Sequence, residues 1–298
     1  RRAWGGVEGG VRPRGVSRRG QPMRRWWTRT VTGLPPLPGV LELKDKIIVI
    51  TGAGSGIGRA LAVRFHAEGA KKVVAVDINL SNAQDTASMV DGIAMMADVA
   101  VEDDIIRVIE DTESQIGAID LFCSNAGVGM GENLESPNAE WQMIWDINVM
   151  SHVFAARHLV PRMVARGGGY LLNTSSAAGL LNQIGGAAYG VTKHAAVGFG
   201  EWLAIHHQHE GIKVSMLCPQ AVRTPMTEVA NDATAAAASN GMIEPEELAD
   251  TVVEELRKES FIILPHPIVL EYMRNKTTNY DRWIGGMNKL MRKITGLI

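Results

Sequence analysis

From Lys44 onward, short runs rich in β-branched residues alternate with longer amphipathic stretches, and this alternation restricts the chain to few folds. Parallel neighbouring strands need a crossover connection, which is usually a helix. We expect strands at residues 46–51, 72–77, 93–97, 119–124, 169–174, 213–218 and 261–264. We expect helices near residues 57–68, 80–90, 101–116, 138–166, 187–209 and 244–259. The alternation predicts an α/β fold in which a doubly wound sheet of seven parallel strands lies between two helical layers.

Residues 1–40 differ in composition from the rest of the chain. They are rich in Gly, Arg and Pro and show no helical or strand periodicity, so we expect a disordered basic extension. An organellar transit peptide, a twin-arginine export signal and upstream sequence before Met23 are the alternatives for this segment. An export signal would need an apolar run after Arg24 and Arg25, and none follows. We expect residues 41–298 to form one domain.

The charge and the cysteines narrow the functional class. The net charge of −2 divides into +8 for residues 1–40 and −10 for the remainder. An acidic body disfavours nucleic-acid binding. The apolar runs are shorter than the 18 or more residues that a transmembrane helix needs. Cys123 and Cys218 stand alone in strand-like runs, which favours a reduced, cytoplasmic protein over a disulfide framework.

A glycine-rich turn joins the first predicted strand to the first predicted helix. Its sequence, from Gly52 to Gly58, is GAGSGIG. Glycines allow the tight turn and let backbone N–H groups approach a pyrophosphate at the positive end of the helix. Because both a strand and a helix flank the turn, the sequence predicts a Rossmann-type dinucleotide site.

An acidic residue, Asp77, ends the second predicted strand, nineteen residues beyond Gly58. A carboxylate at this place can accept hydrogen bonds from the adenosine ribose hydroxyls and would repel a 2′-phosphate. Ser55, in the glycine turn, supplies no cation that could offset the repulsion. The sequence therefore favours NAD over NADP; the alternative is a solvated acid at a strand end.

A tyrosine and a lysine, Tyr189 and Lys193, lie four residues apart in a predicted helix and so share one face. The pKa of a phenol is near 10, too high for a general base at neutral pH. A nearby ammonium lowers that pKa, so the pair is suited to acid–base chemistry. Ser176 follows a predicted strand, where its hydroxyl could hold a substrate oxygen against Tyr189.

Several ordered motifs together resemble the single-domain branch of the short-chain dehydrogenase/reductase family over roughly residues 44–265. The matching residues are Thr51, Gly52, Gly56 and Gly58 of the glycine turn, Asp77, Asp98 with Val99, Ser124-Asn125-Ala126-Gly127, Asn148, Ser176, Tyr189 and Lys193. Ser124 stands where the family has a first Asn. Ser176 lies thirteen residues before Tyr189, which is the family's spacing and selects Ser176 over Ser175.

The resemblance implies residue roles. Tyr189 is the general acid/base, Ser176 orients the carbonyl or alcohol, Lys193 binds the nicotinamide ribose and lowers the pKa of Tyr189, and Asn148 holds the helix and a water relay. Cofactor contacts are implied for Thr51, Gly52, Gly56, Ile57, Gly58, Asp77, Asp98, Val99, Asn125, Ala126, Gly127, Tyr189, Lys193, Pro219, Val222 and Thr224. Gln220 stands where the family usually has Gly and would be strained if the turn needs a positive φ.

The resemblance implies an oxidoreductase that interconverts a secondary alcohol and a ketone with NAD. The alternatives are a carbonyl reductase using NADH or NADPH, and a catalytically silent nucleotide-binding protein, which would be expected to lack Tyr189 or Lys193. Residues 225–243 occupy the place of the family's substrate lid; an ordinary alanine-rich helix is the other interpretation. Few basic residues line this segment, which favours an apolar alcohol or ketone as the substrate.

The last predicted feature is a basic amphipathic helix pattern over residues 281–298, within a C-terminal tail of residues 266–298. It could lie on a membrane surface or pack on a neighbouring subunit, and the resemblance implies a homodimer or homotetramer. His206, His207 and His209 lack a cysteine or carboxylate at ligand spacing, so we expect a solvated helix face and no metal site.

Overall fold

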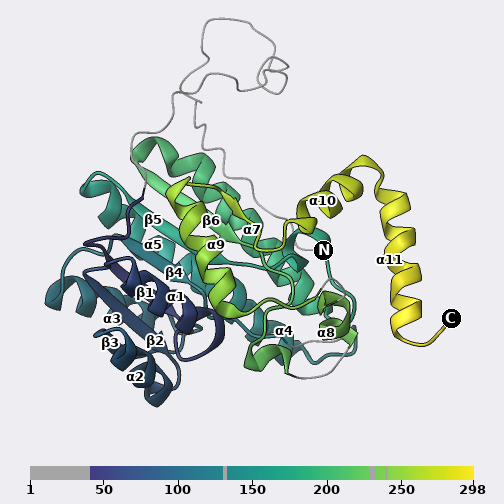
Figure 1. The fold of residues 1–298 in the computed structure, drawn as a ribbon, viewed down its shortest axis with the longest axis horizontal. Coiled ribbons are helices and arrows are strands. Elements are labelled where there is room, and N and C mark those ends of the chain that lie inside the picture. Colours follow the sequence, from purple (N-terminus) through teal and green to yellow (C-terminus); the bar gives the residue numbers. More distant parts are fainter. Residues whose placement is uncertain (1–40, 130–132, 229–231, 239–240) are drawn as a thin grey trace, which may run out of the picture. The chain divides into compact units, whose positions relative to one another are not determined.

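The computed structural model describes residues 41–129, 133–228, 232–238 and 241–298 (Figure 1). The basic extension predicted for residues 1–40 lies outside the described residues. Residues 40–298 form one compact unit, and the description below concerns its described parts.

Seven parallel strands form one sheet in the order β3-β2-β1-β4-β5-β6-β7, which confirms the predicted fold class. Their bounds are β1 Ile47–Thr51, β2 Lys72–Asp77, β3 Ile93–Met96, β4 Leu121–Ser124, β5 Gly169–Thr174, β6 Ile212–Leu217 and β7 Ile262–Ile263. The chain winds outward from β1 to β3 and then returns to pair β4 with β1. This reversal leaves a crevice at the carboxyl ends of β1 and β4, where doubly wound sheets bind ligands.

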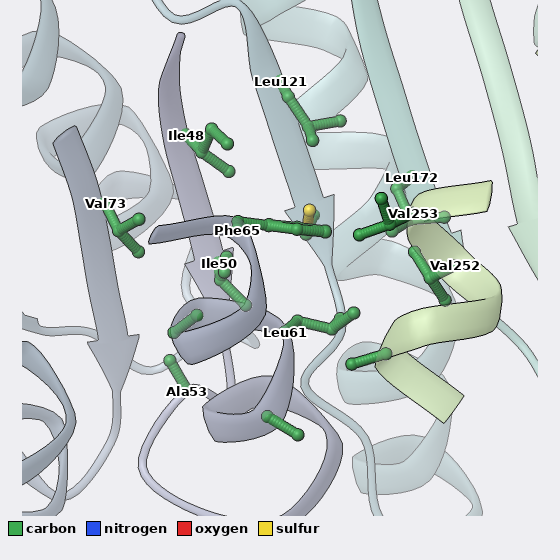
Figure 2. Close-up of a cluster of buried hydrophobic side chains, with 14 of the residues drawn as sticks. Ile48, Ile50, Ala53, Leu61, Phe65, Val73, Leu121, Leu172, Val252 and Val253 are labelled. Carbon is green, nitrogen blue, oxygen red and sulfur yellow. The ribbon is translucent and has the colours of Figure 1, made fainter. Parts of the chain in front are cut away.

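Helices cover both faces of the sheet because successive strand residues point to opposite sides. On β1, Ile48 and Ile50 join the core under α1 (Gly56–Ala67) and α9 (Pro245–Arg257), whereas Val49 joins the opposite core. Figure 2 shows the first core, in which Phe65 of α1 lies over β1. The second core packs under α3 (Glu102–Gln115), α5 (Ser151–Ala165) and α7 (Ala187–His207). The remaining long helix of the sheet layers, α2, spans Leu80–Met89.

The helix predicted over residues 138–166 is divided by a wider turn. It consists of α4 (Asn138–Trp145), a π-helical segment η2 (Asp146–Met150) and α5. The N–H of Ser151 donates to the carbonyl of Asp146, five residues earlier, as a π turn requires. The spacing of apolar residues did not reveal this turn, because the π-helical segment is only five residues long.

Four helical elements connect or follow the predicted ones. They are α6 (Ala178–Leu181), α8 (Asp232–Ala237), α10 (Ile268–Thr278) and α11 (Tyr280–Ile294). Helix α11 corresponds to the basic amphipathic pattern, whereas α10 was not predicted as a helix. In the predicted lid, the described part contains α8, and residues 229–231 and 239–240 lie outside the described residues.

Candidate active site

A cavity of about 710 Å³ opens at the carboxyl ends of the strands, on the side where the chain reverses. It is lined by Ser176 and by the predicted cofactor residues Gly52, Gly56, Ile57, Gly58, Asp77, Asp98, Val99, Asn125, Ala126, Gly127, Tyr189, Lys193, Pro219, Val222 and Thr224. The fold thus brings together residues separated by more than 150 positions. As far as the structure describes the lining, Thr51 and Asn148 do not belong to it.

Thr51 lies behind the cavity and positions the loop that follows β4. Its hydroxyl oxygen accepts hydrogen bonds from the backbone N–H groups of Asn125 (3.0 Å) and Ala126 (3.1 Å). The Asn125 amide donates to the Thr51 carbonyl at 3.1 Å, and its oxygen accepts from the Thr174 hydroxyl at 3.1 Å. Thr51 therefore holds the ends of β1, β4 and β5 together, which differs from the direct cofactor contact that the resemblance implied.

The glycine turn has the shape that a phosphate site requires. Gly52 and Gly56 have φ of +64° and +49°, which favour glycine. A Cβ at Gly58 would come 2.2 Å from the Gly52 carbonyl oxygen, so only glycine lets α1 start this close to β1. Ser55, before α1, makes no side-chain capping bond to any described residue. The N–H groups of the first turn therefore remain available to an anion in the cavity.

The Asp77 carboxylate is held in place by two backbone groups. One oxygen accepts from the N–H of Gly54 at 2.9 Å, and the other accepts from the N–H of Asn79 at 2.9 Å. Each oxygen keeps a further lone pair, which suits a ribose diol. Arg59 on α1 donates to Thr86 and to the Gly54 carbonyl, and it is not among the described lining residues. These residues fit an adenosine without a 2′-phosphate.

The catalytic candidates converge at the other end of the cavity. Tyr189 and Lys193 lie one turn apart on α7, and the Lys193 Nζ is 5.6 Å from the centre of the Tyr189 ring. The Nζ donates to the Thr174 carbonyl at 3.2 Å. Ser176 follows β5; its hydroxyl donates to the Pro219 carbonyl at 3.4 Å and lies near enough to the Tyr189 phenol to lower the pKa of that phenol. The arrangement unites a phenol, a hydroxyl and an amine around one position.

Burial governs the electrostatics of this pair. Burial raises the pKa of Tyr189, and the hydrogen bond from Ser176 opposes this rise only in part. Burial also lowers the pKa of Lys193 to about 8. A low-dielectric surrounding disfavours both the phenolate and the ammonium, so the net shift of the Tyr189 pKa is upward; that the Lys193 charge lowers this pKa stays a prediction.

Asn148 sits in η2 and joins the loop after β4 to the helix layer. Its Oδ1 accepts from the N–H of Val128 at 2.9 Å, and its Nδ2 donates to the Val128 carbonyl at 2.9 Å. A weaker bond of 3.3 Å runs to the Thr192 hydroxyl on α7. A Cβ at Gly127 would lie 3.2 Å from both Asn148 Oδ1 and Lys193 Nζ. Asn148 therefore holds the Gly127–Val128 backbone next to Lys193 without lining the cavity itself.

A buried histidine lies one helical turn from Asn148, and no sequence pattern predicted its burial. His152, one turn after Asn148, is 1% exposed. The Asn173 amide lies beside its ring, yet neither ring nitrogen makes a well-aligned hydrogen bond to a described residue. Burial, together with the Lys193 charge, lowers the pKa of His152 to about 3. The ring is therefore neutral at physiological pH.

The substrate end of the cavity differs from the prediction in two ways. Gln220 does not have a positive φ, so the strain considered for this position is absent there. Its N–H instead donates to the Nδ1 of His266 at 3.2 Å. The wall also includes residues that the sequence did not mark. They are Leu181 and Ile184 before α7, Met226 after β6, and Tyr272, Trp283, Met287 and Leu290 of α10 and α11.

In the part of the chain that the structure describes, no cluster of three His, Cys, Asp or Glu side chains could hold a metal ion. The His207 ring is paired with Glu210 at 2.6 Å, and the His206 ring stacks on Trp202. The helices within the described ranges are all too short or too polar to cross a membrane.

Comparison with known proteins places the site in a family. A family model for the short chain dehydrogenases matches residues 46–235. The 1-deoxy-11-beta-hydroxypentalenate dehydrogenase of Streptomyces exfoliatus is 34% identical over 231 residues, which cover 75% of this chain and 84% of the relative. The meso-2,3-butanediol dehydrogenase of Serratia marcescens is 32% identical over 217 residues, which cover 70% and 86%.

A solved structure agrees with these relatives. The short-chain dehydrogenase/reductase of Burkholderia phymatum in complex with NAD matches with a TM-score of 0.73 and 28% identity, covering 81% of this chain and 96% of that one. The region matched by the family model contains the glycine turn, Ser176, Tyr189 and Lys193. The chain therefore belongs to the short-chain dehydrogenase/reductase family, whose enzymes act on CH–OH groups.

Proposed function

We propose that the protein is an NAD-dependent dehydrogenase that oxidises an apolar secondary alcohol to a ketone, a reaction the same residues serve in reverse. One observation carries the proposal. A single cavity runs from the Asp77 carboxylate, past the open N-terminus of α1, to the Tyr189 phenol. This cavity joins a dinucleotide cradle to an acid–base group, as hydride transfer from an alcohol requires.

The residues divide the chemistry between them. NAD bound in this cavity would supply the acceptor for the hydride that leaves the alcohol carbon. The Tyr189 oxygen takes the hydroxyl proton during oxidation and returns it during reduction. The Ser176 hydroxyl, which lines the same cavity as Tyr189, holds the substrate oxygen next to the phenol. Lys193 favours the phenolate by its charge, and Asn148 keeps the Gly127 backbone beneath the Lys193 amine.

The assay uses NADH formation with a panel of steroids, retinoids, sugars, hydroxy fatty acids and small secondary alcohols. We expect turnover with apolar secondary alcohols and a loss of at least about 100-fold in kcat for Tyr189→Phe, since acid–base catalysis contributes on this scale. NADH binding, followed by fluorescence, should be retained in this variant. Full activity of Tyr189→Phe would refute its role.

The preference for NAD is argued from Asp77. The substitution Asp77→Asn keeps the bond from Gly54 N–H but removes the charge that repels a 2′-phosphate. We expect the ratio of kcat/KM for NAD to that for NADP to fall by roughly tenfold or more, because one charge interaction near a surface is worth over 1 kcal/mol. An unchanged ratio would exclude Asp77 as the selective residue.

The location and the assembly of the protein are proposed from its cysteines and from the surface of α7. Both cysteines are free and buried, which suits a reducing, cytoplasmic environment. On α7, Trp202 and Ile205 are exposed apolar side chains, which suits a homodimer or homotetramer. Sedimentation at several concentrations measures the assembly, and a persistent monomer would exclude it.

A further inference from the structure

The C-terminal arm, defined as α10 and α11 (residues 268–294), follows the last strand and stands next to the substrate end of the cavity. Helix α10 is anchored, because Val269 is fully buried against Ala177 and Leu181. In addition, Lys276 Nζ donates to the Leu180 carbonyl at 2.7 Å. The arm is thus attached to the segment that immediately follows the catalytic candidate Ser176.

Helix α11 has an apolar stripe that the protein itself covers only in part. In α11, which is described throughout, no residue is buried. Trp283, Met287, Met291 and Ile294 are partly covered and recur at helical spacing, so they form one stripe. Ile284, which is not among the described lining residues of the cavity, is 61% exposed. Trp283 contacts Tyr272 of α10, with ring centres 6.3 Å apart, which holds the stripe toward the body.

The stripe faces the catalytic cavity. Trp283, Met287 and the half-exposed Leu290 line the same cavity as Tyr189, and α11 also contacts α8 of the lid region. Among the described lining residues the charged side chains are Asp77, Asp98 and Lys193. The first two lie at the adenosine end, and the third belongs to the catalytic group. The outer wall is therefore apolar where the substrate body would lie.

We infer that α11 forms the distal half of the substrate site and that the substrate is a secondary alcohol with an elongated apolar body. Its hydroxyl lies between Ser176 and Tyr189, while its far end covers Trp283 and Met287. The inference rests on the proposed function for the reaction itself. It adds that these α11 residues determine specificity for substrate length.

The physical expectation is a dependence on chain length. Burial of one methylene contributes about 0.8 kcal/mol, which is roughly fourfold in kcat/KM. The test measures NADH formation by the full chain with 2-alkanols from 2-butanol to 2-dodecanol. We expect kcat/KM to rise by roughly threefold to fourfold for each methylene that reaches the wall, and to level off once the wall is covered.

Two variants test whether α11 supplies that wall. In Trp283→Ala and in Met287→Ala, we expect the ratio of kcat/KM for 2-dodecanol to that for 2-butanol to fall about tenfold. Met287 takes no part in the Trp283–Tyr272 ring contact, so Met287→Ala shows whether the effect requires the loss of that contact. The matched control is Ile284→Ala, which removes an apolar side chain from the same helix outside the cavity and should keep the wild-type ratio.

Three results would overturn the inference. The first is a ratio unchanged in both variants, or a wild-type kcat/KM independent of chain length. The second is an equal effect of Ile284→Ala, which would mean that the helix surface as a whole matters. The third is α11-dependent flotation of the protein with anionic liposomes together with unaltered length selectivity, which would assign the stripe to a membrane.

Failure of the proposed function can be distinguished from failure of this inference. If the wild-type protein oxidises none of the alcohols, the reaction assignment is wrong. The wall is then tested by calorimetric binding of 2-dodecanone to the full chain. Met287→Ala should weaken this binding about tenfold, and Ile284→Ala should leave it unchanged. Equal binding by the wild-type protein and Met287→Ala, or no binding at all, would refute the wall.

Discussion

At the scale of single residues, the site combines groups whose ionised forms burial disfavours. A phenol and an amine buried together near one cavity each favour the neutral form until a ligand or a charge intervenes. This explains why the pKa of Tyr189 is raised and that of Lys193 is lowered to about 8.

The pair predicts opposite pH profiles for the two reaction directions. Oxidation requires the deprotonated phenol, so its kcat/KM should rise with pH, by up to tenfold per unit below the apparent pKa. Reduction requires the phenol with its proton, so its kcat/KM should fall above the same value. Steady-state rates from pH 6 to 9.5 in both directions measure this. A flat oxidation profile would contradict the role of Tyr189.

Asn148 offers a second test at this scale. Substitution by Ala removes both bonds to Val128 and leaves the partly buried N–H and carbonyl of Val128 without the Asn148 side chain. We expect the free energy of unfolding to fall by about 1–3 kcal/mol, measured by urea titration, and kcat to fall with it. Thr192→Val removes only the 3.3 Å bond and should cost less. Equal losses of stability in the two variants would contradict the role of the two Asn148–Val128 bonds.

At the scale of elements, the strand-to-helix turn is the most constrained local structure. The Cβ of Gly58→Ala would meet the Gly52 carbonyl, which is backbone and cannot rotate away. Helix α1 would have to move from β1, and overpacking of this kind costs about 1–3 kcal/mol. We expect Gly58→Ala to lose that much stability, measured by denaturant titration, and to weaken NADH binding measured by fluorescence.

The matched control for Gly58 is Gly198, inside α7. A Cβ at Gly198 meets nothing within 4 Å. Helix propensity then predicts that Gly198→Ala stabilises the protein by up to about 1 kcal/mol. If both alanines changed stability in the same direction, the close approach at Gly58 would not be the cause of its effect.

The elements also show how far local patterns can predict a structure. The spacing of apolar residues predicted the bounds of the seven strands and of the long helices within a few residues, because a residue's place in a strand or helix decides which face it lies on. It missed the π turn at Asn148, because the bond pattern of one turn leaves no compositional trace. It missed α10 as well, whose only buried residue is Val269 and whose covering comes from a distant segment.

At the scale of the whole molecule, two buried histidines link folding to pH. Burial lowers the pKa of His152 to about 3 and also lowers the pKa of His266. Below about pH 6.5 the unfolded chain binds protons at these rings, whereas the folded protein does not. The unfolded state then binds more protons, so the free energy of unfolding falls as pH falls.

We therefore expect stability to decrease between pH 6.5 and 4.5 by up to about 1.4 kcal/mol per pH unit from His152, and His266 adds to this decrease just below pH 6.5. Urea titrations at pH 7, 6 and 5 measure this slope. His152→Gln keeps a neutral polar group and should reduce the slope, with His266 supplying the remainder. A slope that His152→Gln leaves unchanged would show that its ring gains a proton within the folded protein.

Local order along the chain was enough to predict the parallel sheet, the glycine turn, Asp77 at its strand end and the Tyr189–Lys193 helix face. Each of these depends on spacing within one or two elements, where backbone geometry sets which side chains lie together. Long-range packing decided the rest. It placed Thr51 behind the cavity, buried Tyr189 so that the pKa of its phenol is raised, and brought Trp283 and Met287 to the wall of the cavity. Desolvation and cavity shape depend on which distant segments close over a residue, and spacing along the chain carries no record of that.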